Sequence, residues 1–223
     1  MAPRKTTTRE RLISAAAELF RRQGYAQTGV NQIIQGANAT SGSFYHFFPA
    51  KEDLLLAVVD HVAEVFETEV FAPASERTDD PIEEISAILD LYRLNLDHRG
   101  LTFGSPMASL SAEVSENHPQ VRARLAQVFA AWSGRIEELL RRAGPRLPPH
   151  IDYTALAQLI VCAMEGAVLC TRLNHSLAPF EATASQLTSY LDLLDNRTEL
   201  QLAISRPAPE AQDSSQSADW RSW

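Results

Sequence analysis

Serines, a glycine and aromatic rings are concentrated in one short stretch of this acidic chain, TSGSFYHFFPAKEDLLL, residues 40–56. A hydrolase, a metal centre and a nucleic-acid interface would each use some of these side chains. No serine stands in the glycine pattern of a nucleophile elbow, and no two of the nine glycines have the G-x-G spacing of a nucleotide-binding loop. We therefore expect a protein that is not an enzyme and that holds no cofactor.

Histidine and cysteine spacing gives equally little support for a metal site. The six histidines are His46, His61, His98, His118, His150 and His175. No two of them have the i, i+4 spacing that places two imidazoles on one helix face, and no cysteine stands at ligand spacing from them. We predict no metal. Two cysteines are also too few for a disulfide framework and are typical of a reducing cytoplasm.

Charge is unevenly distributed along the 223 residues, whose formal net charge is −8. Residues 1–51 hold seven Lys or Arg against two Glu, so this segment carries +5 and the remainder −13. A basic end on an acidic body can contact DNA while the rest of the protein stays off it. No apolar run approaches the roughly 20 residues that span a bilayer, and no hydrophobic signal core stands at the N-terminus. We expect a cytoplasmic protein without membrane contact.

Apolar residues recur at helical spacing along most of the chain, and no segment alternates with the period of a strand, which predicts an all-α fold. Thr7 and Glu10 have the spacing of a capping box before the first helix. Expected helices span about residues 8–23, 30–37, 40–47, 51–71, 81–97, 151–173 and 180–204, and others open at Pro106 and Pro119. Residues 73–79 are expected to form a loop.

Two short helices joined by a tight turn at Asn38, after a bracing helix, predict a helix-turn-helix whose second helix enters the major groove. Small and hydroxylated residues would bring the backbone close to DNA, ring hydroxyls and imidazoles would contact phosphate, and a lysine at the next helix start would add positive charge. The expected DNA contacts are Thr28, Thr40, Ser41, Gly42, Ser43, Phe44, Tyr45, His46 and Lys51.

The stretch GYAQTGVNQIIQGANATSGSFYHFFPAKEDLL, Gly24 to Leu55, resembles the DNA-binding domain of the TetR family of bacterial transcriptional regulators. The shared residues are Gly24-Tyr25, Thr28, Ile33, Ala37, Gly42, Phe44-Tyr45-His46-Phe47, Lys51-Glu52 and Leu54-Leu55. Ala50 departs from the family, which frequently has a Ser cap there. The resemblance implies a helix-turn-helix domain over residues 1–50 and a larger helical effector-binding and dimerisation domain over residues 51–204. Residues 205–223 have a composition that predicts a disordered tail.

The resemblance also implies a homodimer joined by the last two helices in a four-helix bundle, which places two recognition helices on a palindromic operator in double-stranded DNA. Small residues in the penultimate helix would let a partner helix approach closely. The expected interface residues are Cys162, Ala163, Gly166, Ala167, Cys170, Leu187, Tyr190, Leu191 and Leu194. A redox sensor across the dimer is the alternative role for the two cysteines.

Large apolar side chains on the middle helices predict a pocket for a small apolar or aromatic effector, although such residues commonly form only a core. They are Phe66, Tyr92, Leu96, Phe103, Met107, Phe129, Trp132 and Met164. Candidate polar anchors are Asn95, His98 and Arg99. The expected function is a repressor that its effector releases from the operator. The alternative is a helical interaction protein with a degenerate DNA face.

Overall fold

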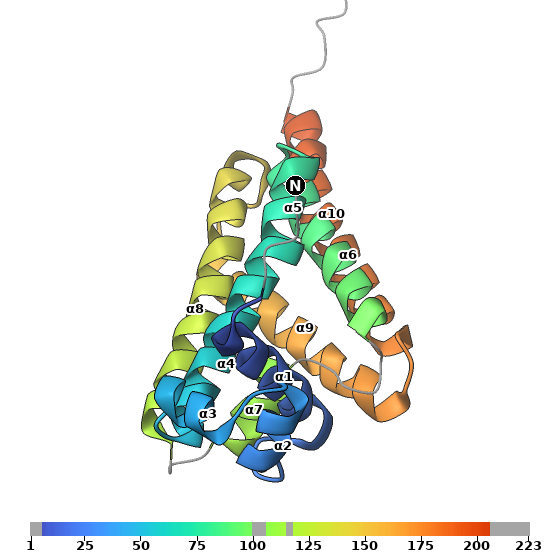
Figure 1. Ribbon diagram of the computed structural model, residues 1–223. Coiled ribbons are helices and arrows are strands. Elements are labelled where there is room, and N and C mark those ends of the chain that lie inside the picture. The colour runs from blue at the N-terminus through green and yellow to red at the C-terminus, as the bar shows by residue number, and fades with distance from the viewer. Residues whose placement is uncertain (1–5, 100–105, 115–117, 206–223) are drawn as a thin grey trace, which may run out of the picture.

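The computed structural model describes residues 6–99, 106–114 and 118–205, and within them helices are the only regular secondary structure (Figure 1). The all-α prediction is confirmed. The three N-terminal helices form a small unit at one end of the molecule, and the other helices form a larger unit (Figure 1). Phe103 and the tail beyond Ser205 lie outside the described residues.

The small unit consists of α1 (Thr8–Gln23), α2 (Val30–Gly36) and α3 (Ser41–Phe47). Its first helix begins with the expected capping box, because the Thr7 hydroxyl accepts from the Glu10 amide at 3.2 Å and the Glu10 carboxylate accepts from the Thr7 amide at 2.7 Å. Buried apolar side chains from α1, α2, α3 and the next helix form the core that fixes the angle between α2 and α3. They are Leu12, Ala16, Phe20, Ile33, Phe44 and Leu54.

The turn between α2 and α3 has the tight geometry that the sequence predicts. Asn38 adopts a positive φ of 47°, a left-handed conformation that asparagine tolerates better than most residues. The Thr40 hydroxyl accepts from the Ser43 amide at 3.1 Å and thereby caps α3. Arg11 reaches across from α1 and donates to the Ala37 carbonyl at 3.1 Å, so the turn is fastened to the bracing helix.

Helix α4 (Lys51–Phe66) leads from the small unit into the larger one, and it continues without a break into the π-turn η1 (Glu67–Phe71) and α5 (Ala72–Arg77). Ala50 offers no capping side chain, but its amide donates to the Asp53 carboxylate at 2.8 Å. The expectation of a loop over residues 73–79 is wrong for most of that range. Pro73 stands in the first turn of α5, directly after the π-turn, and Ala74 is fully buried.

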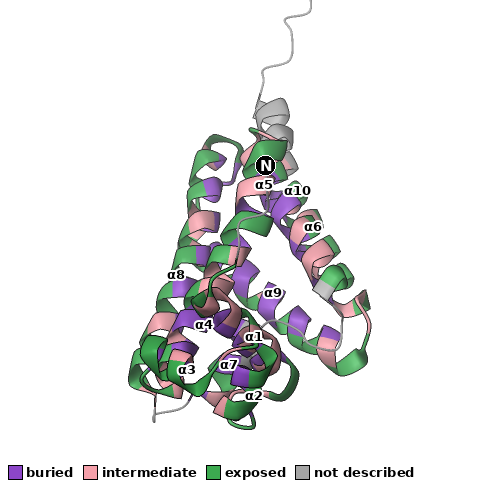
Figure 2. Cartoon of the chain, in the orientation of Figure 1, coloured by how far each residue is buried: buried purple, intermediate pink, exposed green. Residues whose placement is uncertain are grey.

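The remaining helices of the larger unit pack mainly on one another. Helix α8 lies against α4 and α9, while α6 and α9 both lie against α10. In Figure 2 buried and exposed positions alternate along α8, as expected of a helix with one face on a core. The bounds are α6 (Pro81–Arg99), α7 (Pro106–Glu113), α8 (Pro119–Arg142), the short 3-10 turn η2 (Gly144–Arg146), α9 (Tyr153–Asn174) and α10 (Ala178–Ser205).

Helix α9 is long and apolar enough to cross a membrane, with a mean hydropathy of 1.6 over its best 18-residue window. Half of that window is buried inside the protein, where it packs on α8 and α10. Core packing therefore accounts for one side of the helix, and the other side is an exposed surface of apolar and small residues.

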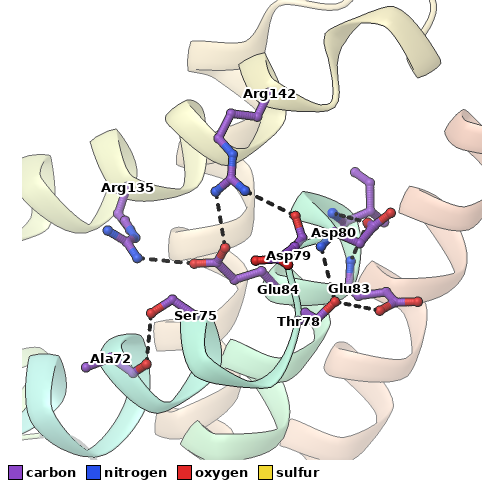
Figure 3. Close-up of polar contacts among 10 residues, drawn as sticks. Ala72, Ser75, Thr78, Asp79, Asp80, Glu83, Glu84, Arg135 and Arg142 are labelled. Atoms are coloured by element: carbon purple, nitrogen blue, oxygen red, sulfur yellow. Dashed lines mark hydrogen bonds and ion pairs between the residues drawn. The ribbon is translucent and has the colours of Figure 1, made fainter.

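Ion pairs tie α6 to α8 at the end of the molecule far from α3 (Figure 3). The Glu84 carboxylate is almost fully buried and accepts from Arg135 at 3.1 Å and Arg142 at 3.3 Å. Arg146 pairs with Asp80 and Asp195, and these two carboxylates raise the pKa of its guanidinium despite partial burial. This end of the larger unit is held by several paired charges, so we expect it to be the more rigid end.

Candidate DNA-binding surface and effector site

One side of α3 is open to solvent and presents the small, hydroxylated and aromatic residues of the opening stretch. Ser41, Gly42, Tyr45 and His46 are exposed, and Ser43 is half-buried. The Tyr45 ring, 57 % exposed, rests edge-on against the buried Phe44 ring at a centroid distance of 5.1 Å. A solvent-facing tyrosine supported from beneath has a fixed direction, which suits a hydroxyl that binds a phosphate.

Two of the expected DNA contacts need correction because their side chains are not accessible. Phe44 is fully buried and packs against Phe48 in the core of the small unit. Thr28 is 1 % exposed, and its hydroxyl donates to the Gly24 carbonyl at 2.7 Å. Both residues stabilise the positions of α2 and α3, so their contribution to DNA binding is indirect.

Lys51 contacts Tyr25 within the protein, a contact that the sequence did not predict. Its ammonium donates to the Tyr25 carbonyl at 2.6 Å and lies 4.0 Å from the centre of the Tyr25 ring. Burial lowers the pKa of this amine, and the nearby Glu113 carboxylate partly opposes that shift. Since an ammonium carries three hydrogens, Lys51 holds the α1–α2 turn and retains donors for a phosphate.

The same turn rests on the larger unit through a set of contacts that we name the domain junction: Tyr25, Lys51, Glu113 and His118. The Glu113 carboxylate, at the end of α7, accepts from the Ala26 amide at 2.9 Å. The His118 ring meets the edge of Tyr25 at 5.4 Å. Burial, together with the Glu52 carboxylate, raises the pKa of the Tyr25 hydroxyl. A movement of α7 or of the start of α8 would therefore act directly on the contacts that hold the small unit.

Gly24 makes this close approach possible. Its φ of 85° lies in the region that disfavours side chains, and a Cβ placed there would come within 2.5 Å of a Glu113 carboxylate oxygen. From the sequence, Gly24 was identified only as one of the residues shared with the TetR family. A glycine alone could not indicate a contact to a carboxylate 89 positions further along the chain.

Most of the expected effector residues gather in the larger unit around an aromatic cluster, which we define as Phe66, Phe71, Tyr92, Phe129 and Trp132. Phe66 stacks on Trp132 at a centroid distance of 4.3 Å and meets the edge of Tyr92 at 4.8 Å. Phe129 meets Trp132 edge-on at 5.4 Å. A cavity of about 10 Å³, room for roughly one water, is lined by Phe66, Phe71, Trp132 and Met164, whereas Tyr92 and Phe129 do not line it.

Other expected pocket residues lie elsewhere. Leu96 and Met107 are buried but do not line this cavity. Asn95 is not one of the cavity's polar anchors, since its amide donates to Glu69 on the π-turn. His98 is exposed near the end of α6, and the side chain of Arg99 lies outside the described part of the structure.

The polar group that does line the cavity is Glu165 of α9, which sequence reasoning missed. Its side chain is 9 % exposed, and the Tyr92 hydroxyl donates to one of its carboxylate oxygens at 2.7 Å. A signal existed in the sequence, because Glu165 is the one charged residue between Tyr153 and Thr171 in an otherwise apolar helix. A buried carboxylate in such surroundings needs compensation and is typical of a functional position.

Two walls of this cavity are shared with an open groove on the outside of the molecule. The groove, of about 410 Å³, lies between α4, the π-turn and α8, and both hollows are lined by Phe71 and Trp132. Movement of those two rings would join the groove to the cavity and give a volume in the range of small-molecule sites, about 300–1,000 Å³.

The outer sides of α9 and α10 form a second apolar surface, the α9–α10 face. Cys162, Gly166, Cys170 and Tyr190 of the expected interface are exposed on it. Large apolar residues that sequence reasoning did not include are exposed there too: Leu159, Leu169, Leu173 and Leu193. A hollow of about 480 Å³ lies between the helices and is lined by Leu159, Ala163, Ala182, Thr183, Gln186, Leu187 and Tyr190.

The expected role of some interface residues needs correction. Ala167, Leu191 and Leu194 are buried within the same chain, where α9 and α10 pack on each other and on the core. Both sides of α9 are apolar, so the sequence showed the periodicity of the helix without showing which side faced outward.

Both units of the chain match known protein families. Residues 12–58 match the sequence signature of the bacterial regulatory proteins of the tetR family, and residues 81–186 match the C-terminal domain of LmrA/YxaF-like transcriptional regulators. The HTH-type transcriptional regulator Rv0196 of Mycobacterium tuberculosis is 32 % identical over 189 residues, which cover 82 % of this chain and 93 % of that one. The chain belongs to the TetR family. It is accordingly a DNA-binding transcriptional regulator.

Other TetR-family proteins agree with this assignment. The HTH-type transcriptional regulator LmrA of Bacillus subtilis is 35 % identical over 138 residues, 61 % of this chain and 73 % of that one. A solved TetR regulator from Chloroflexus aurantiacus superposes with a TM-score of 0.75 at 31 % identity, covering 83 % of this chain and 94 % of that one. A regulatory protein TetR from Rhodobacter sphaeroides gives a TM-score of 0.77 at 25 % identity, with coverages of 82 % and 98 %.

Proposed function

We propose that this TetR-family regulator is a homodimeric repressor that binds a palindromic operator and is released by a small apolar or aromatic effector. The observation that carries the proposal is the α9–α10 face, a continuous exposed surface of leucines and small residues on a protein whose recognition helix is short. The seven residues of α3 bury too little surface for specific affinity, whereas a pair of them can read two half-sites.

The DNA contacts that we propose come from the exposed side of α3 and its surroundings. Ser41, Gly42 and Ser43 stand at the N-terminal end of α3, where side chains reach base edges in a helix-turn-helix. Tyr45 and His46 extend further along the helix and are suited to phosphate, as is the ammonium of Lys51. Thr40 contributes through the cap that it provides to α3.

The dimer that we propose buries the α9–α10 face of each chain against that of the other. Exposed leucines would leave water, and small residues such as Gly166 would let the partner's helices come close. Large contiguous apolar patches are rare on monomeric proteins, which supports an interface on this side of the molecule. Cys162 and Cys170 would then lie in or beside the interface as small apolar groups.

Release would begin in the aromatic cluster. An effector that enters between the rings would displace Phe66 and Phe71, and with them the C-terminal end of α4 and the π-turn. Since α4 begins at Lys51 of the domain junction, its displacement would move the small unit relative to its dimer partner. The effector must bind the DNA-incompetent state more tightly than the competent one, and the ratio of the two affinities limits the degree of release.

Selection of bound sequences from random duplex DNA, at about physiological salt, tests the proposal. We expect a palindrome whose half-site centres lie about one helical turn apart, with a dimer-to-duplex ratio of one in light scattering. Recovery of no preferred sequence by a folded dimer would favour the other candidate, a helical interaction protein. Selection of a single half-site without a symmetric repeat would contradict binding as a dimer.

A further inference from the structure

Phe47 is an exposed aromatic ring at the end of α3, and neither the core of the small unit nor the DNA contacts proposed above explain it. Its side chain is 38 % exposed. On the same helix Phe44 is fully buried, and Phe48, which directly follows α3, is buried as well. Those two rings already hold α3 on the core, so the burial of the helix does not require a third ring at Phe47.

The Phe47 ring stands in a defined setting. The His46 imidazole meets it edge-on at a centroid distance of 4.9 Å, and the Phe48 ring is tilted against it at 6.5 Å. The guanidinium of Arg9, an exposed residue of α1, lies 5.6 Å from the centre of the Phe48 ring. The C-terminal end of α3 thus presents an oriented apolar ring with a positive charge close by, a combination that suits a polyanion with an apolar feature.

The helical geometry of α3 places Phe47 on the side that meets DNA. Successive residues of an α-helix are about 100° apart around its axis. Gly42 and His46 therefore lie opposite the buried Phe44, and Tyr45 and Phe47 lie on the two flanks of that exposed side. Because Gly42 has no side chain, the helix can approach the floor of a groove closely, and the two flanking rings then reach base edges or the backbone.

The major groove offers one apolar partner for such a ring. Phosphates and most base edges are polar, whereas thymine carries a C5 methyl group that projects into the major groove, and phenylalanine is among the residues that contact it. We propose that Phe47 reads a thymine in each operator half-site by van der Waals contact with this methyl, and so determines specificity beyond the polar contacts of α3. This role rests on the proposed use of α3 as the recognition helix.

The length of α3 limits where the thymine lies. Six steps of 1.5 Å separate Ser41 from Phe47, about 9 Å in all. Successive bases of a strand are about 3.4 Å apart along the duplex, so the thymine lies within about three base pairs of the positions read by Ser41 and Ser43. We expect Ser43→Ala to change the sequence preference at those positions and to leave the thymine preference intact.

Removal of single methyl groups from the DNA tests the contact. Deoxyuridine pairs as thymidine does and lacks only the C5 methyl. Fluorescence anisotropy with the full-length protein compares the selected operator with duplexes in which one symmetric pair of thymines at a time is replaced by deoxyuridine. A buried methyl is worth about fourfold in affinity, so we expect one pair whose replacement weakens binding about 15-fold.

Two results with the unaltered protein would overturn the proposal. One is a loss below about twofold at every thymine pair, which would mean that no methyl is buried in the complex. The other is a selected operator with no thymine within about three base pairs of the positions that respond to Ser43→Ala.

Variants assign the methyl contact to Phe47. We expect Phe47→Ala to bind the thymine and deoxyuridine duplexes equally, so that their affinity ratio falls from about 15 to about one, while Phe47→Leu retains a ratio of several-fold. Tyr45→Phe, on the opposite flank, is the matched control: it should weaken binding to both duplexes alike and leave the ratio unchanged. A ratio that survives Phe47→Ala would show that another residue reads the methyl. If Phe47→Ala does not fold, Phe47→Gln replaces the ring with a polar chain and takes its place.

These measurements separate the role of Phe47 from the proposed function. If a dimer selects a palindrome but no thymine pair responds to loss of its methyl, the repressor proposal stands and the role of Phe47 is refuted. If no sequence is selected at all, the proposed reading of DNA by α3 fails and the role of Phe47 fails with it.

Discussion

Helix α3 and the aromatic cluster use aromatic side chains in opposite ways. On α3 one ring, Phe44, is buried as a support, and Tyr45, His46 and Phe47 are exposed above it. In the cluster, Phe66, Phe71, Tyr92 and Trp132 are all buried on one another. Exposed rings in a short polar helix are costly unless they bind something, so the first region indicates its role from sequence. Buried rings are ordinary in any core, so the second becomes informative only when the structure brings a carboxylate among them.

The largest predicted effect tests the division of α3 into a buried supporting ring and an exposed side. Phe44→Ala should destabilise the protein by about 3–5 kcal/mol, because it opens a cavity at a fully buried site. Tyr45→Ala should change the free energy of unfolding by no more than about 0.5 kcal/mol while weakening operator binding roughly tenfold. Urea denaturation and fluorescence anisotropy measure the two quantities. Similar losses of stability in both variants would mean that α3 is not divided into a support and a reading side.

The α9–α10 face resembles α3 in exposing apolar residues. A charge placed on this face tests whether those residues bind a partner chain. Leu169→Glu, at a position 44 % exposed, should leave the monomer folded, dissociate the dimer and weaken operator binding roughly 100-fold or more, because two linked half-sites become independent. Light scattering reports the mass. Gln120→Glu, on the exposed surface of α8, is the matched control and should remain dimeric. A monomer with unchanged operator affinity would contradict the proposed interface.

A smaller effect is expected at the domain junction, where the small unit meets the larger one. Gly24→Ala should cost about 1–2 kcal/mol of stability, since alanine disfavours a φ of 85° and its Cβ would crowd Glu113. Adding Glu113→Ala to that variant removes the crowding and leaves the backbone strain, and Glu113→Ala alone gives the cost of losing the bond to the Ala26 amide. Thermal unfolding of the single and double variants separates the two contributions. Unchanged stability in the Gly24→Ala variant would show that the turn is not held against α7.

The smallest effect concerns the start of α4, the helix that leads from the small unit into the larger one. Ala50→Ser should stabilise the protein by about 0.5–1 kcal/mol by supplying a capping hydroxyl, and Thr40→Ala should cost a similar amount by removing the cap of α3. The denaturant midpoints of the two variants, each compared with that of the unaltered protein, measure these changes in stability. No gain from serine would indicate that the bond between the Ala50 amide and Asp53 already satisfies the helix start.

Local rules recovered much of the fold from sequence. The capping box at Thr7, the left-handed turn at Asn38 and the helix starts at Pro81, Pro106 and Pro119 depend on neighbours within a few residues, and the structure agrees with each. The segment around Pro73 was mistaken for a loop because proline occurs both in loops and in the first turn of helices. Only the burial of Ala74 against the rest of the molecule distinguishes the two.

The sites were less predictable, because they depend on which side of a helix faces inward. Periodicity placed Phe44 on the same short helix as Tyr45 but did not show that one is fully buried and the other 57 % exposed. On α9 it did not distinguish Ala167, which packs inward, from Gly166, which faces solvent. Glu165 could have been singled out as the one charged residue between Tyr153 and Thr171 of α9. Its hydrogen bond to Tyr92 joins positions 73 residues apart and required the fold.

The length of α4 determines how little movement is needed for regulation. Sixteen helical residues span about 24 Å, so a tilt of about 5° about one end displaces the other by roughly 2 Å. In a twofold-symmetric pair the two displacements are opposed and change the separation of the recognition helices by about 4 Å. Hydrogen bonds to DNA tolerate only about 0.5 Å. In the proposed dimer, the helix would thus convert a small angular change into a mismatch that the double helix cannot accommodate.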